Sequence, residues 1–357
     1  MSYPSILILS GGQGSRLWPL TAQNIPKAFL CLDNSEVSLL RKTIKRAKLM
    51  TLPKRIFISA GKAHEQELIL QADEIPYENL IFEPTARGTL PCIGFSALYM
   101  KRQNQSGTMM TMPGEQLIKD DIAFRDVMFQ AVYFAEKFNT VVALGIKPTF
   151  PATRFGYIKI GKQASSNDGF TIFESEGFTE KPDENKVLDF LSSGRYLWNS
   201  GIYTFPISWL SGMISKFAPD VHEKLIEIEE SIGTINEDEV IERVYPEIRN
   251  ISVDYAVMEK SENMLVIPTD IYWNDMGTWT EVSETWEIDQ HTNSHYGEYI
   301  SIDSNGCIIY AHKKNVAIIG VQNVIIIDTP DGLLVCDKNR ADDVKLIAQK
   351  IKLTKGE

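Results

Sequence analysis

The stretch from Ser5 to Arg16 reads SILILSGGQGSR, and the expected fold is built outward from it. Its first five residues, SILIL, have the composition and length of a buried strand. Gly11, Gly12 and Gly14 follow at once, and glycines let a backbone turn sharply and come close to a ligand. The N-terminus is therefore predicted to be a strand that runs straight into a glycine loop.

Strand-like runs and amphipathic stretches alternate up to about residue 150. The strand-like runs are Ser5–Leu9, Arg55–Ser59, Asn79–Phe82, Gly107–Met112 and Thr140–Leu144. Helical spacing occurs in Leu39–Leu49, Pro91–Met100 and Ala123–Phe138. Such alternation predicts an α/β fold, Rossmann-like, with a mostly parallel mixed sheet, helices on both faces and right-handed crossovers.

The pattern changes beyond about residue 150. Two antiparallel strands and three helices are expected there, at Tyr157–Ile160, Phe170–Phe178, Glu184–Ser193, Trp209–Phe217 and Val221–Ile232. From about Tyr296 short strands alternate with turns such as Asn305-Gly306, and a last helix fits Ala341–Ile351. We expect one large α/β domain over residues 1–290 and a small all-β segment with a final helix over residues 291–357.

The charge, hydropathy and cysteine content of the chain limit which partners it can bind and which compartment it can occupy. The 357 residues carry a net charge of −11, which argues against nucleic acid or an anionic membrane as a partner. No segment reaches the roughly 18 apolar residues that span a bilayer, and the N-terminus lacks the features of a signal peptide. The 4 cysteines are scattered without a CxxC pair, as expected for reduced thiols. We therefore expect a cytoplasmic protein.

The glycine turn predicts a phosphate-binding site. Successive backbone N–H groups from Gly11 to Ser15 can form an anion nest, and Arg16 and Lys27 add mobile positive charge. The spacing fits neither GxxxxGK[ST] nor GxGxxG, so the P-loop and the dinucleotide fingerprint are both excluded. A plain tight turn is the alternative for the glycines alone, and the added basic residues favour phosphate binding.

The loop resembles the signature of the sugar-phosphate nucleotidyltransferases. With Trp18 and Pro26–Leu30 (PKAFL), it is closest to the GDP-mannose pyrophosphorylases, also called mannose-1-phosphate guanylyltransferases. Five more segments resemble motifs of that family: Glu83–Thr89 (EPTARGT), Phe178–Pro182 (FTEKP), Trp198–Gly201 (WNSG), Asp254–Lys260 (DYAVMEK) and Trp273–Trp279 (WNDMGTW). The resemblance implies a nucleotidyltransferase catalytic domain over 1–290, closed by a short β-helix over 291–357, without the isomerase domain fused to some relatives.

The reaction that the resemblance implies joins GTP and a sugar 1-phosphate. An oxygen of mannose 1-phosphate attacks the α-phosphorus of GTP, and pyrophosphate leaves in line to give GDP-mannose. Such catalysis is mainly positioning and charge neutralisation. Two alternatives stay open: a guanylyltransferase for another sugar 1-phosphate (a heptose or a deoxyhexose), and a sensor that binds a nucleotide sugar without turnover. Exposed strand edges in the C-terminal segment could also form a homodimer surface.

The nucleotide-binding residues are expected in two segments. They are Gly11, Gly12, Gly14, Ser15, Arg16 and Lys27 from the loop, and Glu83, Arg87 and Gly88 from EPTARGT. Arg16 and Lys27 are also catalytic candidates, because they would stabilise the departing pyrophosphate. Glu83 could accept hydrogen bonds from guanine, or it could be a strand-end glutamate that faces solvent. Gly88 stands where the family has Asn.

The resemblance implies a sugar-phosphate site formed by Gly156, Glu180, Lys181, Asn199 and Gly201. Lys181, the third catalytic candidate, would steer the sugar phosphate, while Glu180 and Asn199 can hydrogen-bond sugar hydroxyls. The alternative for Glu180 and Lys181 is a surface ion pair of little energy. Arg154 stands where the family usually has Gly, and it could reach a phosphate or lie on the surface.

Two carboxylates are expected to bind Mg²⁺, which typically takes one or two carboxylates plus phosphate oxygens. The resemblance implies Asp275 as one ligand, and the alternative is a helix N-cap or a turn residue. The family's second aspartate, in a P-x-D-H segment, is replaced here by Glu115, which keeps the charge but reaches one methylene further. A solvated glutamate without a ligand role is the alternative for Glu115.

Overall fold

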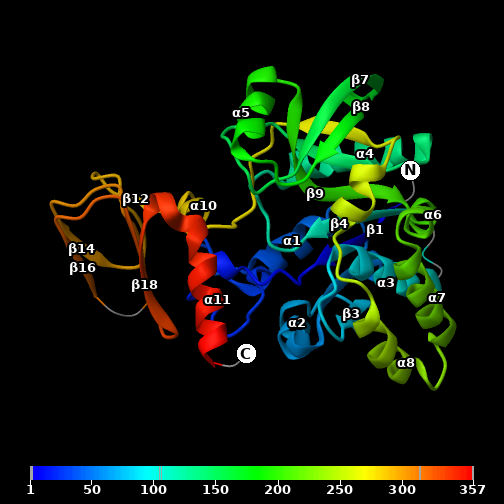
Figure 1. Cartoon of the computed structure of the whole chain (residues 1–357), viewed down its shortest axis with the longest axis horizontal. Coiled ribbons are helices and arrows are strands. Elements are labelled where there is room, and N and C mark those ends of the chain that lie inside the picture. Colours follow the sequence, from blue (N-terminus) through cyan, green and yellow to red (C-terminus); the bar gives the residue numbers. More distant parts are fainter. Residues whose placement is uncertain (1–2, 104, 106, 313–314, 356–357) are drawn as a thin grey trace. The chain divides into compact units, whose positions relative to one another are not determined.

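The computed structural model describes residues 3–103, 105, 107–312 and 315–355, which form two compact units (Figure 1). The first unit comprises the chain up to Leu9 together with Thr43–Gly114 and Ile118–Trp273. The second comprises Ser10–Lys42, Glu115–Leu117 and the chain from Asn274 onward. The glycine loop thus groups with the C-terminal segment. The predicted domain boundary near residue 290 cuts the chain once, whereas each of these units combines several segments of the chain. That boundary stays a prediction.

A mixed sheet is the framework of the first unit. Its strands are β1 (Ser5–Leu9), β2 (Ile56–Gly61), β3 (Leu80–Glu83), β4 (Thr108–Pro113), β6 (Val142–Ile146), β7 (Tyr157–Asn167), β8 (Phe170–Thr179), β9 (Tyr196–Pro206) and β10 (Leu265–Thr269). The described strands lie in the order β3-β2-β1-β4-β9-β6-β10-β8-β7. β1 to β4 are parallel to one another, and β6 is parallel to β10. β9 lies antiparallel between β4 and β6.

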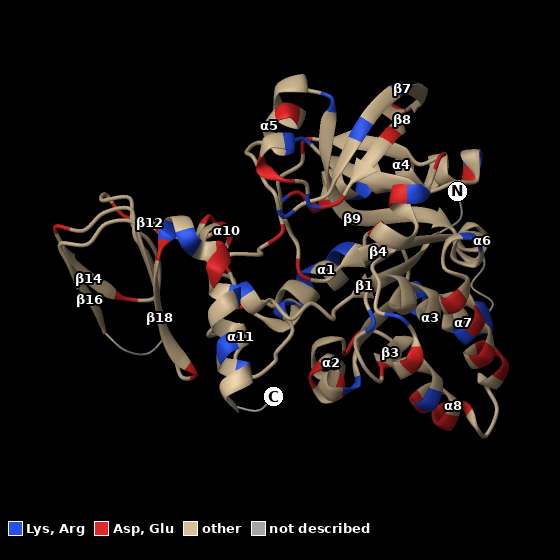
Figure 2. Cartoon of the chain, viewed as in Figure 1, with Lys and Arg blue, Asp and Glu red and all other residues tan. Residues whose placement is uncertain are grey.

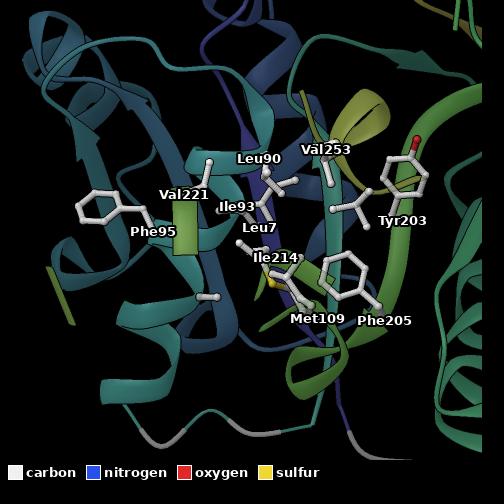
Figure 3. Close-up of a cluster of buried hydrophobic side chains, with 14 of the residues drawn as sticks. Leu7, Leu90, Ile93, Phe95, Met109, Tyr203, Phe205, Ile214, Val221 and Val253 are labelled. Atoms are coloured by element: carbon white, nitrogen blue, oxygen red, sulfur yellow. The ribbon is translucent and has the colours of Figure 1, made fainter. Parts of the chain in front are cut away.

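Helices cover both faces of this sheet. They are α1 (Leu39–Ala47, which begins in the second unit), α2 (Glu65–Gln71), α3 (Thr89–Arg102), α4 (Asp121–Phe138), α5 (Glu184–Ser193), α6 (Ile207–Phe217), α7 (Pro219–Ser231), α8 (Glu237–Val244) and α9 (Val253–Ala256). Leu7, Met109 and Phe205 of the sheet share one buried cluster with Leu90 of α3 and Ile214 of α6 (Figure 3). The buried side chains of α4, which packs on β6 and β9, lie outside that cluster and therefore cover the other face. The predicted α/β fold class is confirmed.

Local sequence signals explain where the helices begin and end. Asp120 caps α4 by accepting hydrogen bonds from the backbone N–H groups of Ile122 and Ala123, and Asn139 ends the helix in the left-handed conformation. Most predicted bounds agree with the structure to within a few residues, but the strand predicted at Tyr157–Ile160 continues to Asn167 as β7. The last helix begins at Val344 rather than Ala341, because Lys338–Asp343 form a 3₁₀ helix, η8.

Charged side chains of both signs are mixed along the outer helices. Figure 2 shows Lys and Arg interspersed with Asp and Glu on α7 and α8, where Arg243 pairs with Glu227 at 2.9 Å. This mixing leaves no basic stripe on these two helices of the kind that binds nucleic acid. Across the described residues, no helix is both long enough and apolar enough to cross a membrane.

The C-terminal part of the second unit is built from short strands. They are β12 (Glu287–Ile288), β13 (Ser294–Tyr296), β14 (Tyr299–Ile302), β15 (Ile308–Ala311), β16 (Val316–Ile319), β17 (Val324–Thr329) and β18 (Gly332–Asp337). β13, β15 and β17 stack in parallel, β14 pairs in parallel with β16, and Cys307, Ile309 and Ile318 fill the space between them. The helices α10 (Trp279–Ser283) and α11 (Val344–Lys355) flank this all-β segment in sequence. Two short strands, β5 (Leu117–Ile118) and β11 (Trp273–Asn274), complete the described strands.

Asp289 organises the turn that leads into the β-segment. Its carboxylate accepts hydrogen bonds from the backbone N–H of His291 and Asn293 and from the Tyr299 hydroxyl. Burial acts to raise the pKa of Asp289, but these hydrogen bonds outweigh it and lower the pKa from 3.8 to about 2. A carboxyl whose pKa is lowered on folding adds stability above its unfolded pKa and loses it as pH falls.

We expect Asp289→Asn to reduce the free energy of unfolding by about 1 kcal/mol at pH 7, a value discounted for solvent exposure. The difference from wild type should shrink as the pH falls below about 4, because the carboxyl of the unfolded chain takes up its proton there, while the native carboxylate with its pKa of about 2 does not yet do so. Urea denaturation over a pH series from 7 to 3 measures this. Asp303→Asn, an exposed change in the same segment, should show no such trend, and a constant deficit for Asp289→Asn would contradict the assignment.

Candidate active site

The glycine loop of the second unit is folded around Lys27. The loop backbone closes when Lys27 N–H donates to the Gly12 carbonyl at 2.9 Å and the Thr21 hydroxyl donates to the Gly14 carbonyl at 3.2 Å. Gly14 has φ of 56°, and a methyl group there would lie 3.1 Å from Lys27 Cβ. Glycine is required at this position by both backbone conformation and space. The short 3₁₀ helix η1 (Ser15–Leu17) follows and carries Ser15 and Arg16.

Lys27 is a buried cation, with only 5% of its surface exposed. Its Nζ donates to the Asp275 carbonyl at 2.6 Å and lies 3.7 Å from Asp275 Oδ2. A buried ammonium requires partners of this kind, because an unpaired charge in the interior is strongly unfavourable. The structure thus brings together Lys27 and Asp275, two residues that the sequence placed at the site from separate motifs.

Glu115 completes this group. A methyl group at Gly12 would lie 2.6 Å from Glu115 Oε1, so the carboxylate occupies the space beside the loop that a side chain at Gly12 would need. Burial raises the pKa of Glu115; the charge of Lys27 opposes the shift, and that of Asp275 adds to it. Glu115 thus packs against the loop and is only partly exposed, and its role as a metal ligand stays a prediction. Glu115 and Asp275 are near enough to repel each other, with Lys27 beside both.

The turn that carries Asp275 has its own support. Thr278 caps α10 by accepting from Glu281 N–H, while Glu281 Oε2 accepts from Gly277 N–H at 3.0 Å. The pattern differs from a capping box in that Glu281 accepts from the residue before the cap, and Thr278 is the cap. The alternative of Asp275 as the N-cap is therefore wrong. Met276, next to Asp275, has φ of 54°, a left-handed conformation that side chains rarely adopt and that is concentrated at functional sites.

The first unit holds a second polar cluster around Gly156. A methyl group at Gly156 would lie 2.5 Å from Glu180 Oε2 and 3.2 Å from Asn199 Cβ, so both side chains pack against this glycine. Lys181 Nζ donates to Glu180 Oε1 at 2.7 Å, and burial raises the pKa of Glu180 although Lys181 opposes the shift. The ion pair between Glu180 and Lys181, given above as the alternative, is thus present. It is not a solvated surface pair, because the Glu180 side chain is only 9% exposed. Lys181 has φ of 47°.

Asp254 is a member of this cluster that sequence reasoning missed. Its Oδ1 accepts from Asn199 Nδ2 at 3.0 Å and from the Tyr203 hydroxyl at 2.5 Å. Asn199 Oδ1 in turn accepts from Gly201 N–H at 3.1 Å, which fixes the amide orientation. Gly201 has φ of 73° and forms this turn within β9. Asp254 lies in the segment DYAVMEK, whose resemblance to a family motif could have pointed to it. No residue of that segment is given a role from the sequence alone.

Glu83 is held by protein hydroxyl groups. Its Oε1 accepts from Ser59 at 3.1 Å and its Oε2 from Tyr245 at 2.6 Å, and the residue is 7% exposed. The alternative of a strand-end glutamate facing solvent is therefore wrong. A contact with guanine stays a prediction, and it would require one of these oxygens to accept a further hydrogen bond. Arg87 lies near Tyr245, and its buried Nε has no hydrogen-bond partner among the described residues.

Gly88 has a structural reason to differ from the family's Asn. Its φ is 83°, and a methyl group there would lie 2.5 Å from the Ile251 carbonyl oxygen and 2.9 Å from Asn250 Oδ1. The Arg87 carbonyl accepts from Ile251 N–H at 3.0 Å, so this segment is held against the glycine. Arg154, the other departure, is half-buried and stacks on Phe155, with its guanidinium carbon 4.7 Å from the ring centre.

Gly12→Ala should reduce the free energy of unfolding by about 1–3 kcal/mol, because the new methyl group displaces the Glu115 carboxylate. Gly11→Ala is the matched control, since a methyl group there meets nothing within 4 Å. Chemical denaturation without substrate measures both. Introducing Gly12→Ala into a Glu115→Ala background should remove most of the loss, and equal losses in both backgrounds would contradict the contact.

Gly88→Asn, which introduces the family's residue, should destabilise the protein by about 2–4 kcal/mol because it combines backbone strain with a clash against a carbonyl oxygen. The thermal unfolding midpoint measures the effect. Gly212→Ala serves as the control, because a methyl group at that helical position meets nothing within 4 Å. A Gly88→Asn protein as stable as wild type would show that residues 250 and 251 do not restrict this position.

Two family models match the chain. The model described as nucleotidyl transferase matches residues 5–293, and the model described as MannoseP isomerase/GMP-like beta-helix domain matches residues 297–351. The first covers the α/β sheet, the glycine loop and every predicted site residue. The second covers most of the short stacked strands.

Curated relatives and a solved structure agree with these matches. A mannose-1-phosphate guanylyltransferase of Escherichia coli is 35% identical over 99% of this chain and 77% of its own length. The alginate biosynthesis protein AlgA of Pseudomonas aeruginosa is 31% identical over 97% of this chain and 71% of its own. A Thermus thermophilus structure described as mannose-1-phosphate geranyltransferase has a TM-score of 0.87 at 29% identity, covering 98% of this chain and all of that one.

These matches confirm the family expected from the motifs. They extend over both the α/β part and the β-segment, at identities where family membership is secure. The chain belongs to the nucleotidyl transferase family, among its members that carry the MannoseP isomerase/GMP-like β-helix domain and resemble the mannose-1-phosphate guanylyltransferases.

Proposed function

We propose that this chain transfers GMP from GTP to mannose 1-phosphate, giving GDP-mannose and pyrophosphate. The observation that carries the proposal is the grouping of a buried lysine and two carboxylates, Lys27, Glu115 and Asp275, against a glycine loop. Relatives named for this activity, aligned over nearly the whole chain, support the choice of substrates.

The loop residues act on the triphosphate. Backbone N–H groups of Gly11, Gly12, Gly14 and Ser15 bind phosphate oxygens, and the side chains of Arg16 and Lys27 neutralise their charge. A phosphate oxygen of the sugar substrate forms a bond to the α-phosphorus, and the bond from that phosphorus to the bridging oxygen of pyrophosphate breaks. The negative charge that builds up on the leaving pyrophosphate is stabilised by the two cations.

The cluster around Gly156 binds the sugar phosphate. Lys181 neutralises the phosphate, and the fixed acceptors on Glu180 and Asp254 receive hydrogen bonds from sugar hydroxyls. The Asn199 amide donates to Asp254 and accepts from Gly201 N–H, which holds it in a fixed orientation for a hydrogen bond with the sugar. Gly156 and Gly201 allow the substrate to approach the backbone.

Glu115 and Asp275 are the proposed residues that hold Mg²⁺. Their mutual repulsion fits a place where a divalent cation would bind, and two carboxylates plus phosphate oxygens form a donor set that Mg²⁺ accepts. No group of three or more Asp, Glu, His or Cys side chains in the described part of the chain is arranged to hold a metal, so substrate phosphates would supply the remaining ligands. The ion would neutralise charge on the triphosphate.

The base is proposed to lie beside Glu83, Arg87 and Gly88. The unpartnered Nε of Arg87 supports a polar ligand there, because a buried donor without a partner is rare in folded proteins. Tyr245 and Ser59 hold Glu83 in place for this role.

Lys181→Met tests the sugar-phosphate site. It should lower kcat/KM for mannose 1-phosphate by about 100-fold, because it removes a charge and leaves Glu180 unpaired beside a phosphate. The matched control is Lys186→Met, whose lysine pairs with Asp183 on the surface. Pyrophosphate release from GTP, mannose 1-phosphate and Mg²⁺ measures both. Equal kinetics for the two variants would remove Lys181 from the site.

The substrate identity is tested on the wild-type protein in the same assay. The assay is run with a panel of sugar 1-phosphates that includes a heptose and a deoxyhexose. Turnover of another sugar phosphate in the absence of turnover of mannose 1-phosphate would replace the leading proposal. Binding of GDP-mannose without pyrophosphate release from GTP and any of the sugar 1-phosphates would favour the nucleotide-sugar sensor. The reason for considering a sensor is the extra methylene at Glu115.

A further inference from the structure

The C-terminal segment contacts the glycine loop at several points within the second unit. Gln23 Nε2 donates to Asp331 Oδ1 at 2.7 Å, and Trp279 Nε1 donates to the Trp18 carbonyl at 3.1 Å. Arg16 Nε lies 3.0 Å from Asp342 Oδ1. The loop is therefore held by residues that lie some 260 to 330 positions further along the chain.

The turn between β17 and β18 packs against the aromatic side chain of the loop. A methyl group at Gly332 would lie 3.0 Å from Trp18 Cζ2 and 3.5 Å from Pro19 Cβ. Gly332 has no unusual φ, so the requirement for glycine here comes from space alone. The turn thus restricts where Trp18, two residues beyond Arg16, can lie.

The contact with Asp342 engages one edge of the Arg16 guanidinium. Asp342 forms an ion pair with Nε, which is buried and has no hydrogen-bond partner among the described residues. Among the described residues, no ion pair or hydrogen bond engages the two terminal nitrogens of Arg16. A guanidinium carries five N–H donors, so the four on the terminal nitrogens remain for phosphate oxygens. Asp342 can therefore fix the side chain without using the donors that a triphosphate needs.

We propose that Asp342 and the Asp331-Gly332 turn are positioning residues that hold the glycine loop, and Arg16 in particular, in the form that binds the triphosphate. The proposal rests on the proposed function, because it assigns to the β-segment a role in nucleotide binding. Arg16 and Asp342 are partly exposed, at 30% and 57%, so the pair contributes little to overall stability. Its effect comes from restricting a flexible side chain before the substrate arrives, which lowers the entropy lost on binding.

Asp342→Asn tests the ion pair, and Asp343→Asn is its matched control. Asp343 is the next residue of η8, pairs with Arg340 at 2.7 Å and loses the same charge on substitution. We expect Asp342→Asn to raise KM for GTP about fivefold while leaving KM for mannose 1-phosphate and the thermal midpoint nearly unchanged. Asp343→Asn should leave both KM values at the wild-type level, and Asp342→Glu should recover part of the loss.

A double-mutant cycle shows whether Asp342 acts through Arg16. In an Arg16→Lys background, which lacks Nε, Asp342→Asn should have little further effect on the affinity for GTP measured by calorimetry. Gly332→Ala tests the turn separately, and it should weaken GTP binding with no change in the binding of mannose 1-phosphate. Gly212→Ala is its control.

The outcomes separate this inference from the function on which it rests. Wild-type protein that releases no pyrophosphate from GTP and any sugar phosphate would overturn the proposed function. Active wild-type protein in which Asp342→Asn matches Asp343→Asn in KM for GTP would overturn only the positioning role. Additive losses for Arg16→Lys and Asp342→Asn would also overturn it, and an equal rise in both KM values would show a general structural effect instead.

Discussion

The burial of the Lys27 ammonium is the constraint on which the candidate site depends. A cation that is 5% exposed must be surrounded by oxygen acceptors, and the chain supplies them from a distant turn at Asp275. The loop backbone closes on the same residue through the Gly12 carbonyl. One charge therefore holds the loop and the Asp275 turn together with Glu115 beside them, and moving the turn away would leave a buried charge unpaired.

Glycines mark the places where this arrangement needs space. Gly12 leaves room for a carboxylate, Gly88 for a carbonyl oxygen, Gly156 for a glutamate and Gly332 for an indole ring. In each case the neighbour comes from a segment remote in sequence. The glycine itself is visible in the sequence, but the neighbour that requires it is visible only in the fold. The sequence alone therefore does not explain why residue 88 is a glycine.

Sequence reasoning reached the fold class and most elements because their apolar periodicity is strong. It missed β9 as a strand, since Asn199, Ser200 and Gly201 interrupt its apolar run and shift its register against β6. The site residues carried by dense motifs were named in advance, and the structure groups Lys27 with Glu115 and Asp275. Asp254 was missed because its role depends on pairing with Asn199 across 55 positions, which no local pattern reveals.

The backbone at Lys181 has a consequence for how stability and activity are balanced in this protein. A φ of 47° suits glycine, and an L-residue with a side chain adopts it at about 1–2 kcal/mol. The chain nevertheless carries a lysine there, with its amine on Glu180. The cluster around Gly156 is thus a place where the fold is locally less stable than its sequence could make it, and substitutions selected for thermal stability alone would tend to remove the amine.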